Sequence, residues 1–175
     1  MNKKVITFSI IILWLVISLG FIGLKQYTIS TGKKVLLETV PVDPRDFLRG
    51  DYVILNYKIS NLDFSKLVSF RQKFDCGKNF YVKLEQRGKY WEAIAINKKE
   101  EIKKEDVIIK GKVRHGDRVE YGIENYFIPE GKGKEIEQSM RRGSGNTVSV
   151  EAIVDKFGNA IINKLYINDK EVKFE

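Results

Sequence analysis

The chain is poor in the residues from which most metal sites and many catalytic sites are built. Its 175 residues include one cysteine, Cys76, and one histidine, His115. One cysteine excludes an internal disulfide and a cysteine-rich zinc site, and one histidine excludes His-pair and multi-histidine metal motifs. A Ser-His-Asp triad could use only His115. We therefore expect no metal ion and no cofactor, and we assign no catalytic residue.

Nucleic-acid binding is also not expected, although the chain is basic. It has 31 Lys and Arg against 23 Asp and Glu, a formal net charge of +8. The lysines are spread through residues 98–104, 110–118 and 132–142, which is more typical of a solvated surface than of a binding stripe. No known nucleic-acid-binding motif is present. An acidic lipid surface or an anionic polymer of the cell envelope fits this charge better.

A long apolar run near the N-terminus predicts a membrane anchor. Residues 5–24 are twenty residues without a charge, preceded by Lys3 and Lys4 and followed by Lys25. About 20 apolar residues in a helix span the ~30 Å hydrocarbon core of a bilayer. A cleaved signal peptide and a buried core helix are the alternatives, but residues 19–26 lack an Ala-x-Ala cleavage pattern. We interpret residues 1–24 as an uncleaved signal-anchor. Lys3 and Lys4 then favour a cytoplasmic N-terminus, with the rest of the chain outside.

The remainder divides into a polar stalk, residues 25–34, and a β-rich domain, residues 35–175. Short β-branched and aromatic runs alternate there with turn signals, which is typical of hairpins. The predicted strands are residues 35–40, 52–59, 79–86, 90–97, 107–114, 118–128, 147–154, 159–167 and 171–174.

The predicted fold class is mainly β (α+β). We expect an antiparallel barrel or a two-layer sheet of about 8–9 strands, because strand and helix patterns do not alternate regularly along the chain. One or two short helices are predicted at residues 61–74 and 132–142. One N-terminal transmembrane helix precedes this domain.

A charged loop lies between the first two predicted strands. Asp and Arg alternate there, and such pairs form charge-assisted, often bidentate hydrogen bonds. Gly50 can adopt a positive φ before the next strand. We therefore predict that the loop is held by its own ion pairs; a ligand or partner site using the same arginines is the alternative. The charged residues are Asp43, Arg45, Asp46, Arg49 and Asp51.

A second unusual segment covers residues 119–133. Gly122 inside a strand pattern indicates a bulge or the close approach of another backbone. Glu124 could pair with Arg45 or Arg49 and join the two segments in one buried polar network. Alternatively, Asp51 and Glu124 could form a carboxylate pair for acid–base hydrolysis.

These two segments resemble one bacterial protein family. The pattern Gly-Asp-Tyr-x-x-Leu-x-Tyr is matched by Gly50, Asp51, Tyr52, Leu55 and Tyr57. The chain is therefore similar to the bacterial GDYXXLXY family, which is named after this pattern. The likeness also includes residues 41–46, Arg49, Tyr121, Gly122, Glu124 and residues 126–133 with Glu130, and it covers roughly residues 32–174. The resemblance implies a membrane-anchored protein, encoded beside or fused to multi-spanning membrane proteins, and no established chemistry.

Two functional hypotheses follow. In the first, the chain is a non-enzymatic accessory domain outside the cytoplasm that binds a multi-spanning membrane protein or the cell envelope. In the second, it is an envelope hydrolase that uses the Asp/Glu/Arg cluster. A hydrolase needs carboxylates that converge in an open pocket, whereas an accessory domain buries the same side chains against one another. We favour the accessory domain.

Overall fold

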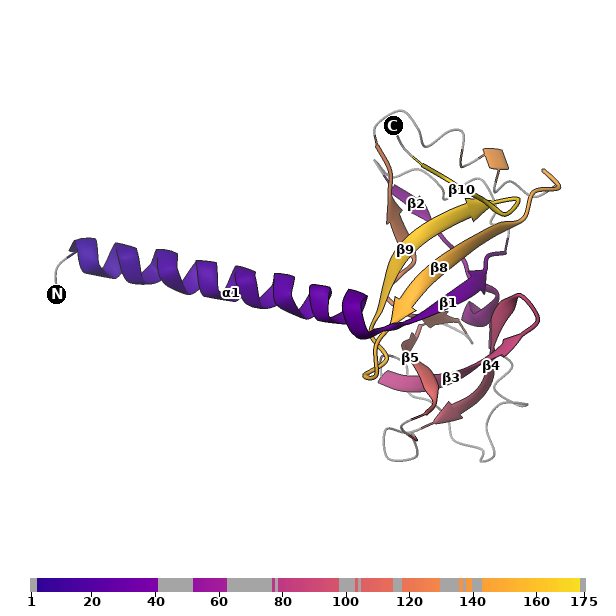
Figure 1. Cartoon of the computed structure of the whole chain (residues 1–175), viewed down its shortest axis with the longest axis horizontal. Coiled ribbons are helices and arrows are strands. Elements are labelled where there is room, and N and C mark those ends of the chain that lie inside the picture. The colour runs from indigo at the N-terminus through magenta and orange to yellow at the C-terminus, as the bar shows by residue number, and fades with distance from the viewer. Residues whose placement is uncertain are drawn as a thin grey trace.

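A computed structural model of the chain describes residues 3–40, 52–62, 77, 79–97, 103, 105–114, 118–129, 136, 138–139 and 143–173. The predicted fold class is confirmed: one N-terminal helix precedes a β-rich domain with ten strands in the described part (Figure 1). All strand pairs are antiparallel.

Helix α1 (Lys3–Thr31) extends away from the β domain (Figure 1). It is long and apolar enough to cross a membrane, with a mean hydropathy of 2.7 over its most apolar window. Thr28 is its only buried residue. The helix continues past the apolar run, so most of the expected polar stalk is helical. Only Gly32 separates α1 from the first strand.

Two four-stranded sheets and one strand pair make up the β domain. The first sheet has the order β1 (Lys33–Glu38), β8 (Val148–Val154), β9 (Ala160–Ile167) and β10 (Lys170–Glu171). The second has the order β4 (Tyr90–Asn97), β3 (Asn79–Arg87), β5 (Val107–Val113) and β6 (Val119–Glu120). The pair consists of β2 (Tyr52–Ile54) and β7 (Asn125–Phe127).

The three groups of strands share one hydrophobic core. Bridges between Thr39 and Tyr57, and between Asn61 and Arg118, connect the segments around β2 to both large sheets. Alternate residues of β1, such as Val35 and Leu37, are fully buried, as a strand with one face on the core requires. The core combines side chains from all three groups, so the β strands form one unit.

The hairpins are predicted well, but three strands are shorter than expected. One is β10, which covers Lys170–Glu171 where residues 171–174 were predicted. The β3–β4 and β8–β9 hairpins are confirmed, and β5 pairs with β6. The prediction of one strand over residues 118–128 is wrong, because this segment forms two strands. The first, β6, ends at Glu120 and pairs with β5, and the second, β7, pairs with β2. Gly122, with φ +79°, changes the chain direction between them. The predicted strand 52–59 likewise ends at Ile54, before the 3₁₀ turn η2 (Lys58–Ser60).

The two predicted short helices fall largely outside the described residues. Of residues 61–74, Asn61 and Leu62 are described, and Asn61 forms a β-bridge. Of residues 132–142, the described Ile136, Gln138 and Ser139 are helical.

Candidate functional site

The structure describes five of the predicted site residues. These are Tyr52, Tyr57, Tyr121, Gly122 and Glu124. The others lie outside the described residues: Asp43, Arg45, Asp46, Arg49, Gly50, Asp51 and Glu130. The predicted ion pairs of the charged loop, and the pairing of Glu124 with an arginine, therefore stay predictions.

The two signature segments lie side by side although they are about 70 residues apart. In the β2–β7 pair, Tyr52 is opposite Phe127, and their rings are tilted by 56° with centroids 6.0 Å apart. The pairing continues past β2, since the Leu55 amide donates a hydrogen bond of 2.6 Å to the Glu124 carbonyl. Along the first segment, Val53, Leu55 and Tyr57 are buried, whereas the residues between them are partly exposed. The signature pattern thus has one face in the core.

Two tyrosine hydroxyls cross between the segments in opposite directions. Tyr57 donates a hydrogen bond of 2.5 Å to the Ile123 carbonyl, and Tyr121 donates one of 2.5 Å to the Ile59 carbonyl. Both rings are in the hydrophobic core. Burial raises the pKa of both hydroxyls, and the charge of Glu124 raises each pKa further. Both hydroxyls therefore stay protonated and act as hydrogen-bond donors.

Glu124 stabilises the turn that separates β6 from β7. Its carboxylate accepts hydrogen bonds from the backbone N–H groups of Tyr121, at 2.5 Å, and Gly122, at 2.9 Å. A Cβ at Gly122 would meet nothing within 4 Å, so no other chain segment approaches closely here. The glycine is explained by its positive φ. In the described residues, Glu124 is therefore used for backbone structure.

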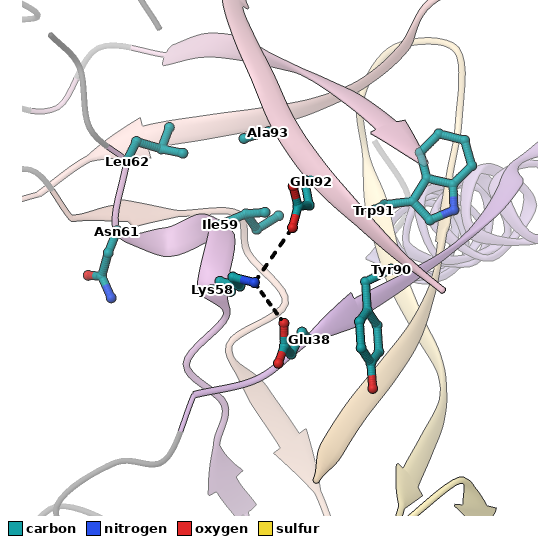
Figure 2. Close-up of a pocket in the computed structure, with 9 residues that line it drawn as sticks. All are labelled: Glu38, Lys58, Ile59, Asn61, Leu62, Tyr90, Trp91, Glu92 and Ala93. Atoms are coloured by element: carbon teal, nitrogen blue, oxygen red, sulfur yellow. Dashed lines mark hydrogen bonds and ion pairs between the residues drawn. The ribbon is translucent and has the colours of Figure 1, made fainter. Parts of the chain in front are cut away.

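One small groove lies between β1, η2 and β4 (Figure 2). Lys58 lies between two carboxylates, with Nζ 3.1 Å from Glu38 and 3.5 Å from Glu92. The hydrogen bond to Glu38 raises the pKa of Lys58, so this amine is charged and not a base at neutral pH. The groove has a volume of about 180 Å³, below the several hundred Å³ typical of ligand sites.

A larger, mostly apolar groove lies at the C-terminal end of α1. Its volume is about 430 Å³, within the range of ligand sites. We call it the helix-end groove; its lining residues are Lys25 of α1, Gly122, Ile123, Asn125, Tyr126 and Phe127, and Ala160, Ile161 and Ile162 of β9. The second signature segment therefore lines an open surface next to the predicted membrane anchor.

The end of α1 is held against the β8–β9 turn. The Thr28 hydroxyl donates a hydrogen bond of 2.9 Å to Oδ2 of Asp155, which is buried. Asp155 also accepts bonds from the Phe157 and Asn159 amides, both at 2.9 Å. A Cβ at Gly32 would collide with the Ile153 side chain and the Thr28 carbonyl, so the chain can pass here only as glycine.

Sequence reasoning singled out Gly122, Tyr126 and Phe127 of the helix-end groove, but it did not find the other residues of the grooves or those of the helix end. Glu38, Lys58 and Glu92 come from three separate elements and have no common spacing. Thr28 and Asp155 are 127 positions apart. For the contact between Thr28 and Asp155, the sequence offered only the turn-forming stretch at 155–158. This stretch predicts a hairpin but not its contact with the helix. In the described part of the chain, no three His, Cys, Asp or Glu side chains are grouped to hold a metal ion.

A comparison with protein families gives a match. The model of a family described as "GDYXXLXY protein" matches residues 14–165, most of the chain. The match includes both signature segments and the second half of α1. No curated protein and no solved structure matches the chain.

Proposed function

The chain belongs to the GDYXXLXY family, and from this premise we propose that it is a membrane-anchored, non-enzymatic accessory domain. We propose that it lies outside the cytoplasm and binds a multi-spanning membrane protein in the same bilayer through the helix-end groove. An anionic polymer of the cell envelope is the alternative partner.

The position of the helix-end groove is the observation that carries this proposal. Lys25, the first charge after the apolar run, lines the groove together with the second signature segment and β9. A partner in the same membrane would reach this surface with the end of a transmembrane helix or with a short loop. The apolar lining of Ile123, Phe127 and Ile161 suits such a partner.

The hydrolase hypothesis has less support in the described residues. The helix-end groove has no Asp or Glu among its lining residues. In the smaller groove, both carboxylates contact Lys58. Glu124, the predicted acid or base, binds two backbone amides. A general acid or base must instead face the reacting group of a substrate.

Photo-crosslinking in intact membranes tests the proposal. A benzophenone amino acid replaces Ile161 in the groove of the full-length chain, and crosslinked proteins are identified by mass spectrometry. We expect one multi-spanning membrane protein. The matched control is the same amino acid at Lys170, an exposed residue of β10 that pairs with Ile167 at the other end of β9. Crosslinks that are the same at both positions, or none at position 161, would argue against binding at this groove.

The side of the membrane is tested separately. In a Cys76→Ser chain, Lys170→Cys supplies one exposed thiol. A membrane-impermeant maleimide should label this thiol in intact cells. Labelling only after the membrane has been broken would place the β domain in the cytoplasm and contradict that part of the proposal.

A further inference from the structure

Two large apolar side chains are exposed on the described part of the β domain: Phe127 in the helix-end groove and Phe157 in the turn beside the end of α1. Phe127 is 76% exposed and Phe157 is 57% exposed. Phe127 lines the helix-end groove with Lys25. Phe157 is in the β8–β9 turn, where the Lys156 amine lies 5.1 Å from its ring centre and 5.8 Å from that of Tyr27 on α1.

The geometry of α1 sets the depth of this surface relative to a bilayer. The apolar run ends at Leu24, and Thr28 is four residues further, about 6 Å along the helix axis. The headgroup layer on each side of the hydrocarbon core is about 5–8 Å thick. Tyr27 and Thr28 are therefore at headgroup level when residues 5–24 span the membrane.

The hydrogen bond between Thr28 and Asp155 keeps the β8–β9 turn at that same depth. Figure 1 shows this turn beside the last turn of α1, on the side of the domain from which the helix extends. The turn carries one carboxylate, Asp155, and that group is buried and bound by four donors. It therefore does not present a free negative charge to a lipid surface.

We infer that this face of the β domain inserts into the headgroup layer of the bilayer that α1 crosses. We call it the aromatic-cation surface: Tyr27, Lys156 and Phe157, next to the helix-end groove that is left for the proposed protein partner. Aromatic side chains are favoured at the membrane–water interface, and lysines there attract the phosphate groups of anionic lipids. The domain then rests on the membrane in one fixed orientation. This inference deepens the proposed function, because it rests on the membrane anchoring of α1.

Fluorescence of single labelled cysteines tests the inference. The full-length Cys76→Ser chain carries Phe157→Cys with an environment-sensitive nitrobenzoxadiazole label. It is reconstituted in vesicles of phosphatidylcholine and phosphatidylglycerol that contain a shallow spin-labelled lipid. We expect a blue-shifted emission and strong quenching. Lys170→Cys, about 26 Å away along the eight residues of β9, is the matched control and should show neither effect.

A third label separates this inference from the anchoring on which it rests. Phe21→Cys lies within the apolar run and should be shielded from water if α1 spans the bilayer. A shielded label at position 21 with a water-exposed label at position 157 would overturn the inference and leave the anchor intact. Exposed labels at both positions would overturn both. Equal quenching at positions 157 and 170 would also reject the assigned face.

The lipid charge is tested with Lys156→Gln. In the original chain, quenching at position 157 should be stronger in vesicles that contain phosphatidylglycerol than in pure phosphatidylcholine. The substitution should reduce this difference, because it removes one cation beside Phe157. An unchanged difference would reject Lys156 as the headgroup contact.

Discussion

The hydroxyl of Thr28 and the carboxylate of Asp155 are 2.9 Å apart, although 127 positions separate them in the sequence. This hydrogen bond joins the last turn of α1 to the β8–β9 turn. Gly32, the single residue between α1 and β1, packs against Ile153 and the Thr28 carbonyl. The direction of the helix is therefore set by the fold of the β domain and not by a flexible stalk.

Thr28→Val should destabilise this junction. Valine keeps the shape of threonine but removes the donor, so the buried Asp155 carboxylate loses one of its four hydrogen bonds. We expect a loss of about 1.5–3 kcal/mol in the free energy of unfolding, the usual range for a bond to a charged group. Unfolding of the detergent-solubilised full-length chain, followed by circular dichroism, measures this free energy. Thr31→Val is the control, because its exposed hydroxyl bonds only the Tyr27 carbonyl; equal losses in both variants would mean that the junction bond contributes nothing.

Gly32→Ala should destabilise the same junction by steric collision. An added Cβ has no space between Ile153 and the backbone of Thr28, so helix and strand must separate. We expect a loss of at least 1 kcal/mol, as for other overpacked sites, and a lower melting temperature. Gly23→Ala is the matched control, because a Cβ there meets nothing within 4 Å. A melting temperature unchanged by Gly32→Ala would show that the helix is not held tightly at this point.

Tyr57 and Tyr121 should each stabilise the contact between the two signature segments. Tyr57→Phe leaves the Ile123 carbonyl without its donor, and Tyr121→Phe leaves the Ile59 carbonyl without its donor. Each change should cost about 1–3 kcal/mol, since the orphaned carbonyls lie in a buried region. Urea unfolding of the single and double variants measures these costs and their coupling. Tyr52→Phe should lower the free energy of unfolding much less, because the Tyr52 ring packs on Phe127 and phenylalanine keeps that ring.

Local sequence patterns predicted the hairpins because their signals lie within a few residues. The turn signal Arg87-Gly88 lies where β3 ends, and Asp155–Gly158 follows β8; each leads into a strand that pairs with the one before it. The break between β6 and β7 was missed, because it depends on the Glu124 side chain turning back to the backbone amides of Tyr121 and Gly122. The sequence alone favoured one strand across Gly122.

The features that define the candidate site depend on contacts between distant segments. The pairing of Tyr57 with Ile123, and of Thr28 with Asp155, cannot be inferred from spacing, because each joins two separately formed elements. The aromatic residues Phe127 and Phe157 also appear in the sequence as ordinary strand and turn residues. The position of Phe127 in a groove with Lys25, and that of Phe157 near Lys156 and Tyr27, follow only from the fold.

Low pH should weaken the helix junction through Asp155. Burial alone would raise the pKa of this carboxyl, but hydrogen bonds from Asn159, Thr28 and Phe157 outweigh it and lower the pKa. A lowered pKa means that the folded state binds the proton less well than the unfolded state. The stabilisation is thus complete above the unfolded pKa of about 3.9 and is lost as the pH falls through the folded value.

Asp155→Asn isolates this effect. Asparagine keeps one acceptor for the Phe157 and Asn159 amides, but its NH₂ group faces the Thr28 donor. The variant should therefore unfold more easily than the original chain at pH 7, and the difference should shrink as the pH falls below about 4. Urea unfolding at several pH values measures the difference. Asp169→Asn, which breaks only the exposed ion pair with Lys89, should cost less than about 1 kcal/mol at pH 7. A difference between Asp155→Asn and the original chain that stays constant down to pH 3 would mean that the Asp155 charge does not stabilise the junction.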